Sequence, residues 1–159
     1  MRESRQLCTF LVDDLHLGID VTDVQEVIRF QQMTAVPLAP EVVLGLINLR
    51  GQIVTVLDLR AMLGLPALHG DDLPTNVVIR GGQYEALSVL VDSLSDVVDT
   101  DDADFEPVPP TLSGPARDLV LGAYKLPDRL LLVLDTERVR SVQRPSAASM
   151  LLLPKISVT

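Results

Sequence analysis

The side chain best suited to recognition chemistry is that of Arg50, which stands with Gly51 between two short apolar runs. This pattern predicts a β-hairpin, because Gly51 has no Cβ and can adopt the positive φ that a tight turn requires. A guanidinium at a rigid turn can make planar, bidentate contacts with carboxylates. Arg50 is therefore predicted to contact a partner protein. An intramolecular ion pair is an alternative role that is compatible with the first.

Residues that could catalyse a reaction are few and scattered. His16 and His69 have no Cys or His neighbour at metal-ligand spacing, and we expect both in surface loops. Cys8 lies among apolar residues, which predicts a buried and unreactive thiol. The chain has neither a Gly-x-Ser-x-Gly elbow nor a Gly-x-x-x-x-Gly-Lys loop. The sequence therefore predicts no enzyme activity, no metal site and no cofactor.

Two aspartates are predicted to have structural roles. Asp58 and Asp135 each follow an apolar run and precede a short helical turn, where a carboxylate can accept hydrogen bonds from free backbone amides. Gly45, Asn48 and Gly51 belong to the same structural motif, since they surround the hairpin turn.

Composition favours a small globular protein that does not bind nucleic acid. The chain has 159 residues, of which 47% are hydrophobic, and its formal charge is −9. Phosphate binding needs clustered Lys and Arg, and no basic run occurs. No apolar run approaches the roughly 20 residues that span a bilayer. The first residues lack the apolar stretch of a signal peptide.

The two halves of the chain resemble each other. A shift of 70 positions places Leu17 on Leu87 and a shift of 77 positions places Asp58 on Asp135. The change of shift predicts a seven-residue insertion in the stretch 107–117. Two similar units predict two subdomains related by a pseudo-twofold axis. Chance similarity between Val-rich strands is the alternative.

Short apolar runs predict strands at residues 7–12, 27–30, 46–49, 53–57, 77–80, 86–91, 120–124 and 130–134. Strands of this length are unstable as isolated hairpins, so we expect them to close into small barrels. The fold class is therefore mainly β with short helical turns. We expect one domain over residues 1–145, with intertwined subdomains over about 15–70 and 75–142. Residues 146–159 form a tail with an apolar cluster, which either folds back over a barrel or docks on another molecule.

The segment Gly45–Arg60 resembles the signature of CheW-like chemotaxis coupling domains. The stretches Asn48-Leu49-Arg50-Gly51 and Asp58-Leu59-Arg60 occupy the family's positions, and the resemblance covers the chain from about residue 7 to 142. Thr55 stands where the family usually has proline, and Ser88 where relatives often have glycine.

The resemblance implies two five-stranded, SH3-like barrels in a non-enzymatic scaffold. Such an adaptor couples chemoreceptors, the methyl-accepting chemotaxis proteins, to a histidine kinase in two-component signalling. One face would meet the regulatory domain of a CheA-like kinase, and a groove would meet the cytoplasmic tip of a receptor. The expected location is the cytoplasm, in receptor arrays or clusters. The alternatives are a diverged relative that binds receptor but not kinase, and a small-molecule sensor that uses the groove between the barrels.

The candidate partner-binding residues lie in both halves. The resemblance places Glu26 near the groove, where it is the expected partner of Arg50 in an intramolecular ion pair. Val24 and Ile28 bracket Glu26 and would form an exposed apolar patch for a receptor helix, or else belong to the core. The resemblance adds partner contacts in the second half, at Val77, Leu87 and Ser88.

Overall fold

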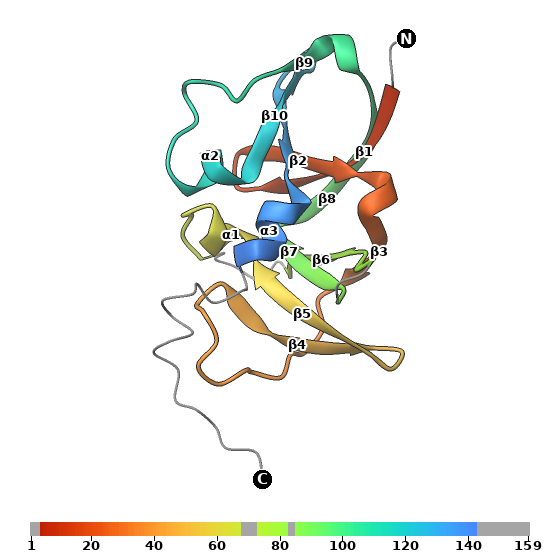
Figure 1. Cartoon of the computed structure of the whole chain (residues 1–159), viewed down its shortest axis with the longest axis vertical. Helices are drawn as coiled ribbons and strands as arrows, with labels where there is room; N and C mark the ends of the chain where they lie inside the picture. Colours follow the sequence, from red (N-terminus) through yellow and green to blue (C-terminus); the bar gives the residue numbers. More distant parts are fainter. Residues whose placement is uncertain (1–3, 68–72, 83–84, 143–159) are drawn as a thin grey trace.

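The structure is a computed structural model, and it describes residues 4–67, 73–82 and 85–142. His69 and the tail from residue 146 lie outside the described residues. Figure 1 shows two sheets, one above the other, with three short helices near their junction. In the described part of the chain, no helix is long and apolar enough to cross a membrane.

The lower sheet in Figure 1 contains five strands, in the order β3 (Val24–Arg29), β6 (Thr75–Ile79), β7 (Leu87–Val91), β5 (Gln52–Asp58) and β4 (Val43–Leu49). The upper sheet contains six, in the order β8 (Ser93–Asp101), β1 (Ser4–Val12), β2 (Leu15–Asp20), β11 (Leu130–Leu134), β10 (Val120–Lys125) and β9 (Phe105–Glu106). The helical segments are η1 (Val21–Asp23), α1 (Leu59–Met62), η2 (Asp102–Asp104), α2 (Pro115–Leu119) and α3 (Thr136–Val142), of which η1 and η2 are single 3-10 turns.

The two sheets have the same pattern of strand pairing. In each, antiparallel pairings surround one parallel pairing, which joins β5 to β7 in the lower sheet and β11 to β2 in the upper sheet; the lower sheet has three antiparallel pairings, and the upper sheet has four because β9 adds one. The registers also correspond, since Val56 lies beside Ser88 in one sheet and Val133 beside Gly18 in the other. The predicted mainly β fold with two similar subdomains is confirmed, and the short strand β9 makes the second sheet six-stranded.

Each sheet takes strands from both halves of the chain. β6 and β7 follow α1 in sequence but complete the lower sheet, whereas β1 and β2, at the start of the described chain, complete the upper one. The sheets therefore do not divide at the expected boundaries of 15–70 and 75–142. The reason is the exchange of a strand pair between the two repeats, which no run of residues reveals.

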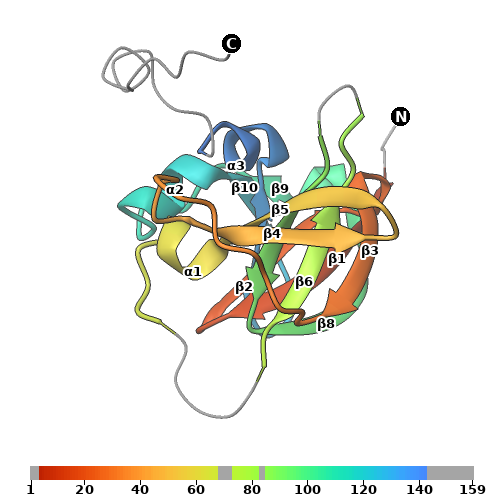
Figure 2. The same cartoon turned by 90° about the horizontal axis from the view of Figure 1, so that it is seen from below.

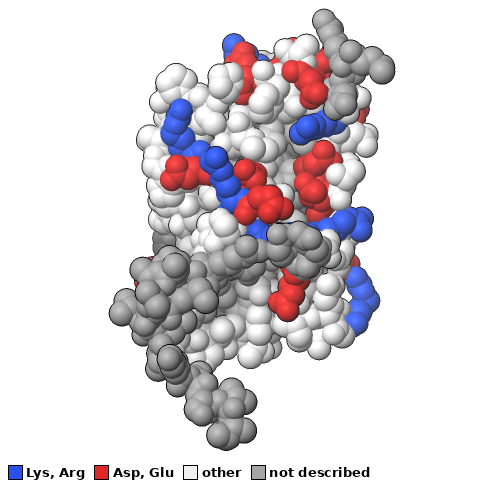
Figure 3. Space-filling view, viewed as in Figure 1, with Lys and Arg blue, Asp and Glu red and all other residues white. Residues whose placement is uncertain are grey.

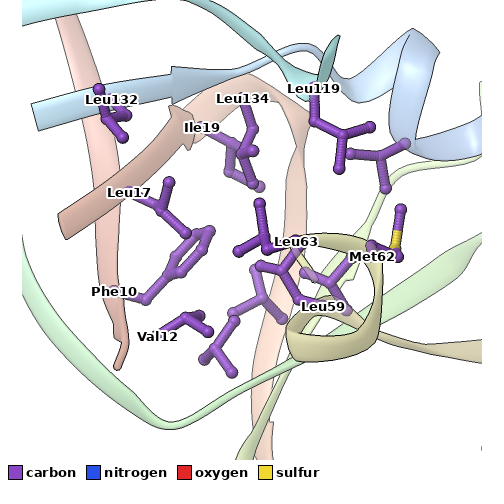
Figure 4. Close-up of a cluster of buried hydrophobic side chains, with 14 of the residues drawn as sticks. Phe10, Val12, Leu17, Ile19, Leu59, Met62, Leu63, Leu119, Leu132 and Leu134 are labelled. Atoms are coloured by element: carbon purple, nitrogen blue, oxygen red, sulfur yellow. The ribbon is translucent and has the colours of Figure 1, made fainter. Parts of the chain in front are cut away.

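A continuous core lies between the sheets. Figure 4 shows Phe10, Val12, Leu17 and Ile19 of β1 and β2 packed near Leu59, Met62 and Leu63, which come from α1 and the residue after it. Burial of a Leu, Val or Phe side chain stabilises a fold by about 1.5–3 kcal/mol. The shared core therefore holds the two sheets in one body and gives the surface features a rigid base.

The predicted insertion coincides with an extra element. α2 begins at Pro115, within the stretch 107–117, and the equivalent segment before β4 contains no helix. Pro115 stands in the first turn of α2, where its missing N–H leaves no hydrogen bond unmade. The insertion thus adds a helix that packs against α3.

Candidate functional site

The β4–β5 hairpin ends in a rigid two-residue turn. Leu49 pairs with Gln52, and Arg50 and Gly51 between them have φ angles of 51° and 88°. The Oδ1 atom of Asn48 accepts a hydrogen bond of 2.8 Å from the Gly51 amide. Two positive φ angles are typical of the tight turn whose twist matches that of the flanking strands. The turn therefore fixes the backbone position of Arg50 and the direction in which its side chain leaves the hairpin.

Arg50 bridges two strands that are not neighbours in the sheet. Its Nη2 atom donates a hydrogen bond to Oε1 of Glu26, in β3, and the two groups form an ion pair. Beside it, Nε2 of Gln25 donates to Oε1 of Gln52 at 3.2 Å. Figure 2 shows the tip of this hairpin close to β3, although β3 and β4 are the opposite edges of the sheet. These contacts join the edges of the lower sheet.

Both members of the ion pair are held in their charged forms. The hydrogen bond from Arg50 is the main reason why the pKa of Glu26 lies below its usual value, and the same bond raises the pKa of Arg50. The Arg50 side chain is nevertheless 73% exposed. Its guanidinium is thus oriented by Glu26 while most of its surface stays accessible to another molecule.

Apolar side chains lie near this pair. Val24 and Ile28, on either side of Glu26, are half-buried, with Val24 against the core between the sheets and Ile28 against the core of the lower sheet. Ile53, three residues after Arg50, is 54% exposed. The sequence prediction did not include Ile53, although its position as the second residue of β5, close to the turn, is a signal for exposure. We name the surface formed by Glu26, Arg50 and Ile53 the hairpin face.

The three candidates from the second half occupy a different environment. Val77, Leu87 and Ser88 are fully buried in β6 and β7. The hydroxyl of Ser88 donates a hydrogen bond of 2.8 Å to Oδ1 of Asn76. They present no surface to a partner, because β6 and β7 are central strands with both faces covered. The expected role of these three residues as direct contacts does not fit their position.

The remaining motif residues shape the chain around the hairpin. Oδ1 of Asp58 accepts a hydrogen bond from the Ala61 amide at 3.4 Å and caps α1. Oδ1 of Asp135 accepts from the amide of Glu137 at 3.0 Å, at the start of α3. A Cβ atom on Gly45 would lie 2.7 Å from the carbonyl oxygen of Thr34, so the chain crosses there at a distance that only glycine permits.

A buried ion pair that the sequence did not predict lies at the other end of the lower sheet. Nε and Nη2 of Arg60 each donate a hydrogen bond of 2.8 Å to the carboxylate of Asp92. Nη2 also lies 3.3 Å from Oδ1 of Asp13, whose amide donates to Asp92. The Arg60 side chain is only 10% exposed. Since Asp13 joins β1 to β2, this ion pair fastens one sheet to the other.

The residues considered for catalysis give no site of that kind. Cys8 is buried, and burial raises the pKa of its thiol. His16 is not in a surface loop as expected, because it lies in β2 and is 5% exposed. Among the described residues, no group of His, Cys, Asp and Glu side chains is arranged to hold a metal ion. On the face shown in Figure 3, acidic and basic side chains are interspersed, and no basic patch appears.

Comparison with known proteins gives one consistent result. A sequence model of the CheW-like domain matches residues 6–143. The chain is 31% identical to a chemotaxis protein CheW of Helicobacter pylori over 86% of this chain and 82% of that one. It is 29% identical to the one of Rhizobium meliloti, over 91% and 92% of the two chains. The crystal structure of the scaffolding protein TtCheW from Thermoanaerobacter tengcongensis is similar, with a TM-score of 0.74 and 26% identity over 84% of this chain and 90% of that one.

Proposed function

Because this chain belongs to the CheW-like domain family, we propose that it is a non-enzymatic scaffold that couples chemoreceptors to a chemotaxis histidine kinase. Its partners would be the regulatory domain of a CheA-like kinase and the cytoplasmic tip of a receptor. In this role it works in the cytoplasm, in receptor arrays or clusters. Coupling then depends on geometry, since a rigid adaptor passes a change in receptor arrangement to the kinase.

One observation carries the assignment of the hairpin face. Arg50 holds a positive φ, is anchored at the tip of a hairpin and is oriented by Glu26, yet its side chain stays largely exposed. The positive φ belongs to the tight turn, which fixes the direction in which the Arg50 side chain leaves the hairpin. A pre-oriented guanidinium binds a partner carboxylate without the entropy loss of ordering a free side chain.

The test is the affinity of two variants for both partners. Arg50→Ala should weaken binding to the kinase regulatory domain or to a receptor hairpin fragment by about thirtyfold, as expected for an arginine at the centre of an interface. Glu26→Gln should cause a smaller loss, because Arg50 remains but is no longer held. Both variants should keep the unfolding midpoint of the wild type, since exposed ion pairs contribute little to stability.

Arg29→Ala is the matched control, because Arg29 is an exposed arginine at the end of β3. It should bind both partners as the wild type does. If Arg50→Ala leaves both affinities unchanged, Arg50 serves only to join the edges of the sheet. If the wild type binds the receptor fragment but not the kinase domain, the protein is a diverged relative that has lost one partner.

A further inference from the structure

A groove of about 230 Å³ lies in the lower sheet beside α1, and we name it the α1 groove. Small-molecule sites usually occupy about 300–1,000 Å³, so the size of this groove suits a few side chains better than a whole ligand. Most of its lining residues are apolar. The apolar residues that form it are Phe30, Met33, Leu44, Ala67, Pro74 and Leu90.

The α1 groove offers apolar surface, and its charged groups already have partners. Met33, Leu44 and Leu90 are half-buried and pack against the core of the lower sheet, which gives the groove a firm base. Arg60 and Asp92 also line the groove, but they form their ion pair with each other. The oxygen atom Oδ1 of Asp58, the third charged lining residue, accepts the hydrogen bond that caps α1. An apolar occupant therefore fits this groove better than a charged one.

The sequence contains an apolar segment that needs such a surface. Residues 150–153 are four consecutive apolar residues, and they lie outside the described residues. Contiguous apolar side chains gain free energy when they are removed from water, and left exposed they lead to association with other molecules.

The length of the chain after α3 allows this segment to reach the α1 groove. Near its end, α3 is attached to the turn between β6 and β7, since Arg140 donates hydrogen bonds of 2.8 Å to the carbonyl oxygens of Arg80 and Glu85. The groove lies toward the other end of β7, near Leu90. The five residues of β7 span about 16 Å. The seven residues 143–149 can span up to about 25 Å, which is enough to cover this distance.

Charge favours the groove of the same chain as the binding site. Residues 143–159 contain Arg144 and Lys155 and no acidic residue. The whole chain has a formal charge of −9, so the rest of the chain is still more acidic and attracts this segment. Its short connection to α3 corresponds to an effective concentration on the order of millimolar. A second copy of the chain would have to reach a similar concentration to compete.

We propose that residues 150–153 bind in the α1 groove of their own chain, with leucine side chains against Met33, Leu44 and Leu90. This contact covers a surface separate from the hairpin face, because none of the described residues that line the groove belongs to that face. It keeps an apolar segment away from other chains and closes the groove to other apolar molecules.

NMR of the full chain, labelled with ¹³C at the methionine methyl groups, tests the contact. Met33 lines the groove, Met150 belongs to the apolar segment, and Met62 lies in the core between the sheets as an internal reference. A nuclear Overhauser contact should connect Met150 with Met33, and its intensity per molecule should not depend on protein concentration. A contact that strengthens with concentration would show that a second copy fills the groove, which would overturn the proposal.

Replacing two leucines of the segment should release it. Leu151→Gln/Leu152→Gln should shift the Met33 signal and leave the Met62 signal unchanged. The matched control is Ser146→Gln/Ser149→Gln, which introduces the same side chains before the apolar segment and should shift neither signal. A Met33 signal that keeps its position in the leucine variant would show that the groove is not occupied by these residues.

A change on the side of the groove gives an independent test. Ala67 is exposed and lines the groove, so Ala67→Arg should block the groove without disturbing the core. A protease that cuts after leucine should then cleave within residues 151–153 about tenfold faster than in the wild type, as expected when cleavage follows the population of the released form. Ala61→Arg is the control, because Ala61 is an exposed residue of α1 that does not line the groove, and its rate should equal that of the wild type. Equal rates in all three proteins would overturn the proposal.

Discussion

The two sheets close their equivalent hairpins with different turns. In the lower sheet the turn is Arg50-Gly51, and both residues have positive φ. In the upper sheet the corresponding turn is Pro127-Asp128, closed by a hydrogen bond of 2.8 Å from the Leu126 amide to the carbonyl oxygen of Arg129. Neither Pro127 nor Asp128 has a positive φ. Proline favours a common turn of negative φ.

This difference separates what the fold needs from what recognition needs. Asp96 occupies the position in β8 that Glu26 occupies in β3, and in the part of the chain that the structure describes it forms no ion pair. The turn residue Asp128 pairs only with its neighbour Arg129, at 3.6 Å, so among the described residues no ion pair joins the upper hairpin tip to β8, and this sheet forms without one. It follows that the Arg50–Glu26 pair is not required for strand pairing, which favours its role in partner binding.

A second difference lies inside the sheets. Gly18 leaves room for Leu131, whose Cδ1 atom would be 3.3 Å from a Cβ atom at that position. The residue equivalent to Gly18 in the lower sheet is Ser88, whose hydroxyl donates a hydrogen bond to Asn76, and the residue equivalent to Leu131 is the smaller Val54. Each sheet thus fills the same space with a different combination of side chains. The departure at Ser88 is a packing difference.

The largest expected effect concerns the Arg60–Asp92 ion pair, which has no equivalent among the described residues of the upper sheet, where Glu137 and Thr22 occupy the corresponding positions. Arg60→Ala should reduce the free energy of unfolding by about 3–5 kcal/mol, because Asp92 would stay buried without its partner. Chemical denaturation measures this loss. Arg138→Ala is the control, since Arg138 lies in the equivalent helix α3 but pairs with Asp135 at the surface, and it should cost no more than about 1 kcal/mol. Equal losses in the two variants would contradict the difference in burial.

The next largest effect is the loss of stability expected when either of two equivalent glycines is replaced by alanine. Gly45→Ala and Gly122→Ala should each reduce stability by about 1–3 kcal/mol through overpacking. The cost at Gly122 should be greater, because its Cβ atom would lie 2.5 Å from the carbonyl oxygen of Glu106, compared with 2.7 Å between Gly45 and Thr34. Thermal unfolding of both variants gives the order. Unchanged stability at either position would show that the crossing segment can move away.

Exchanging the turns tests the comparison directly. The double variant Arg50→Pro/Gly51→Asp gives the lower hairpin the turn of the upper one. It should fold with a midpoint close to that of the wild type, and its affinity for the partner should fall about thirtyfold, as for Arg50→Ala. Circular dichroism and calorimetric titration measure the two properties. If the double variant does not fold, the lower sheet needs its own turn and the comparison fails.

The smallest expected effect is a change of protein stability with pH that comes from the titration of Asp92. Burial is the largest single influence and opposes its ionisation, but the hydrogen bonds from Arg60 and the Asp13 amide, together with the Arg60 charge, outweigh it and lower the pKa of Asp92. This stabilisation is complete above the usual Asp pKa of about 4 and is lost as the pH falls through the lower value in the folded protein.

Unfolding measured between neutral and strongly acidic pH should therefore show a loss of stability that begins near pH 4. Asp92→Asn should lose less over the same range, since it has no proton to gain. A steeper acid loss in the variant than in the wild type would contradict the assignment.

Local features of the fold could be predicted from the sequence. Each of the eight expected strands coincides with an observed strand to within a few residues, because apolar runs between turn residues specify them. β2 was missed, since His16 and Gly18 interrupt its apolar pattern. β8 was missed because it is an edge strand with many exposed polar residues.

Features that depend on distant pairing could not be predicted. The exchange of strand pairs decides that Val77 and Leu87 lie in central strands, and nothing local distinguishes a central strand from one that carries an exposed face. The Arg60–Asp92 pair joins residues far apart in sequence, so only the fold reveals it. Arg50 and Glu26 could be paired in advance because a family resemblance had placed both near the same groove.

The exchange of strands between repeats also sets the order in which the two sheets can form while the chain is being synthesised. β2 pairs in parallel with β11, which begins at Leu130, so β1 and β2 leave the ribosome long before their sheet can form. Contacts between such distant segments slow folding, because a long loop must close first. The lower sheet, whose last strand ends at Val91, can assemble earlier and serve as a template. A nascent chain arrested before β11 should therefore protect β3 to β7 from proteolysis while β2 remains an open edge available to chaperones.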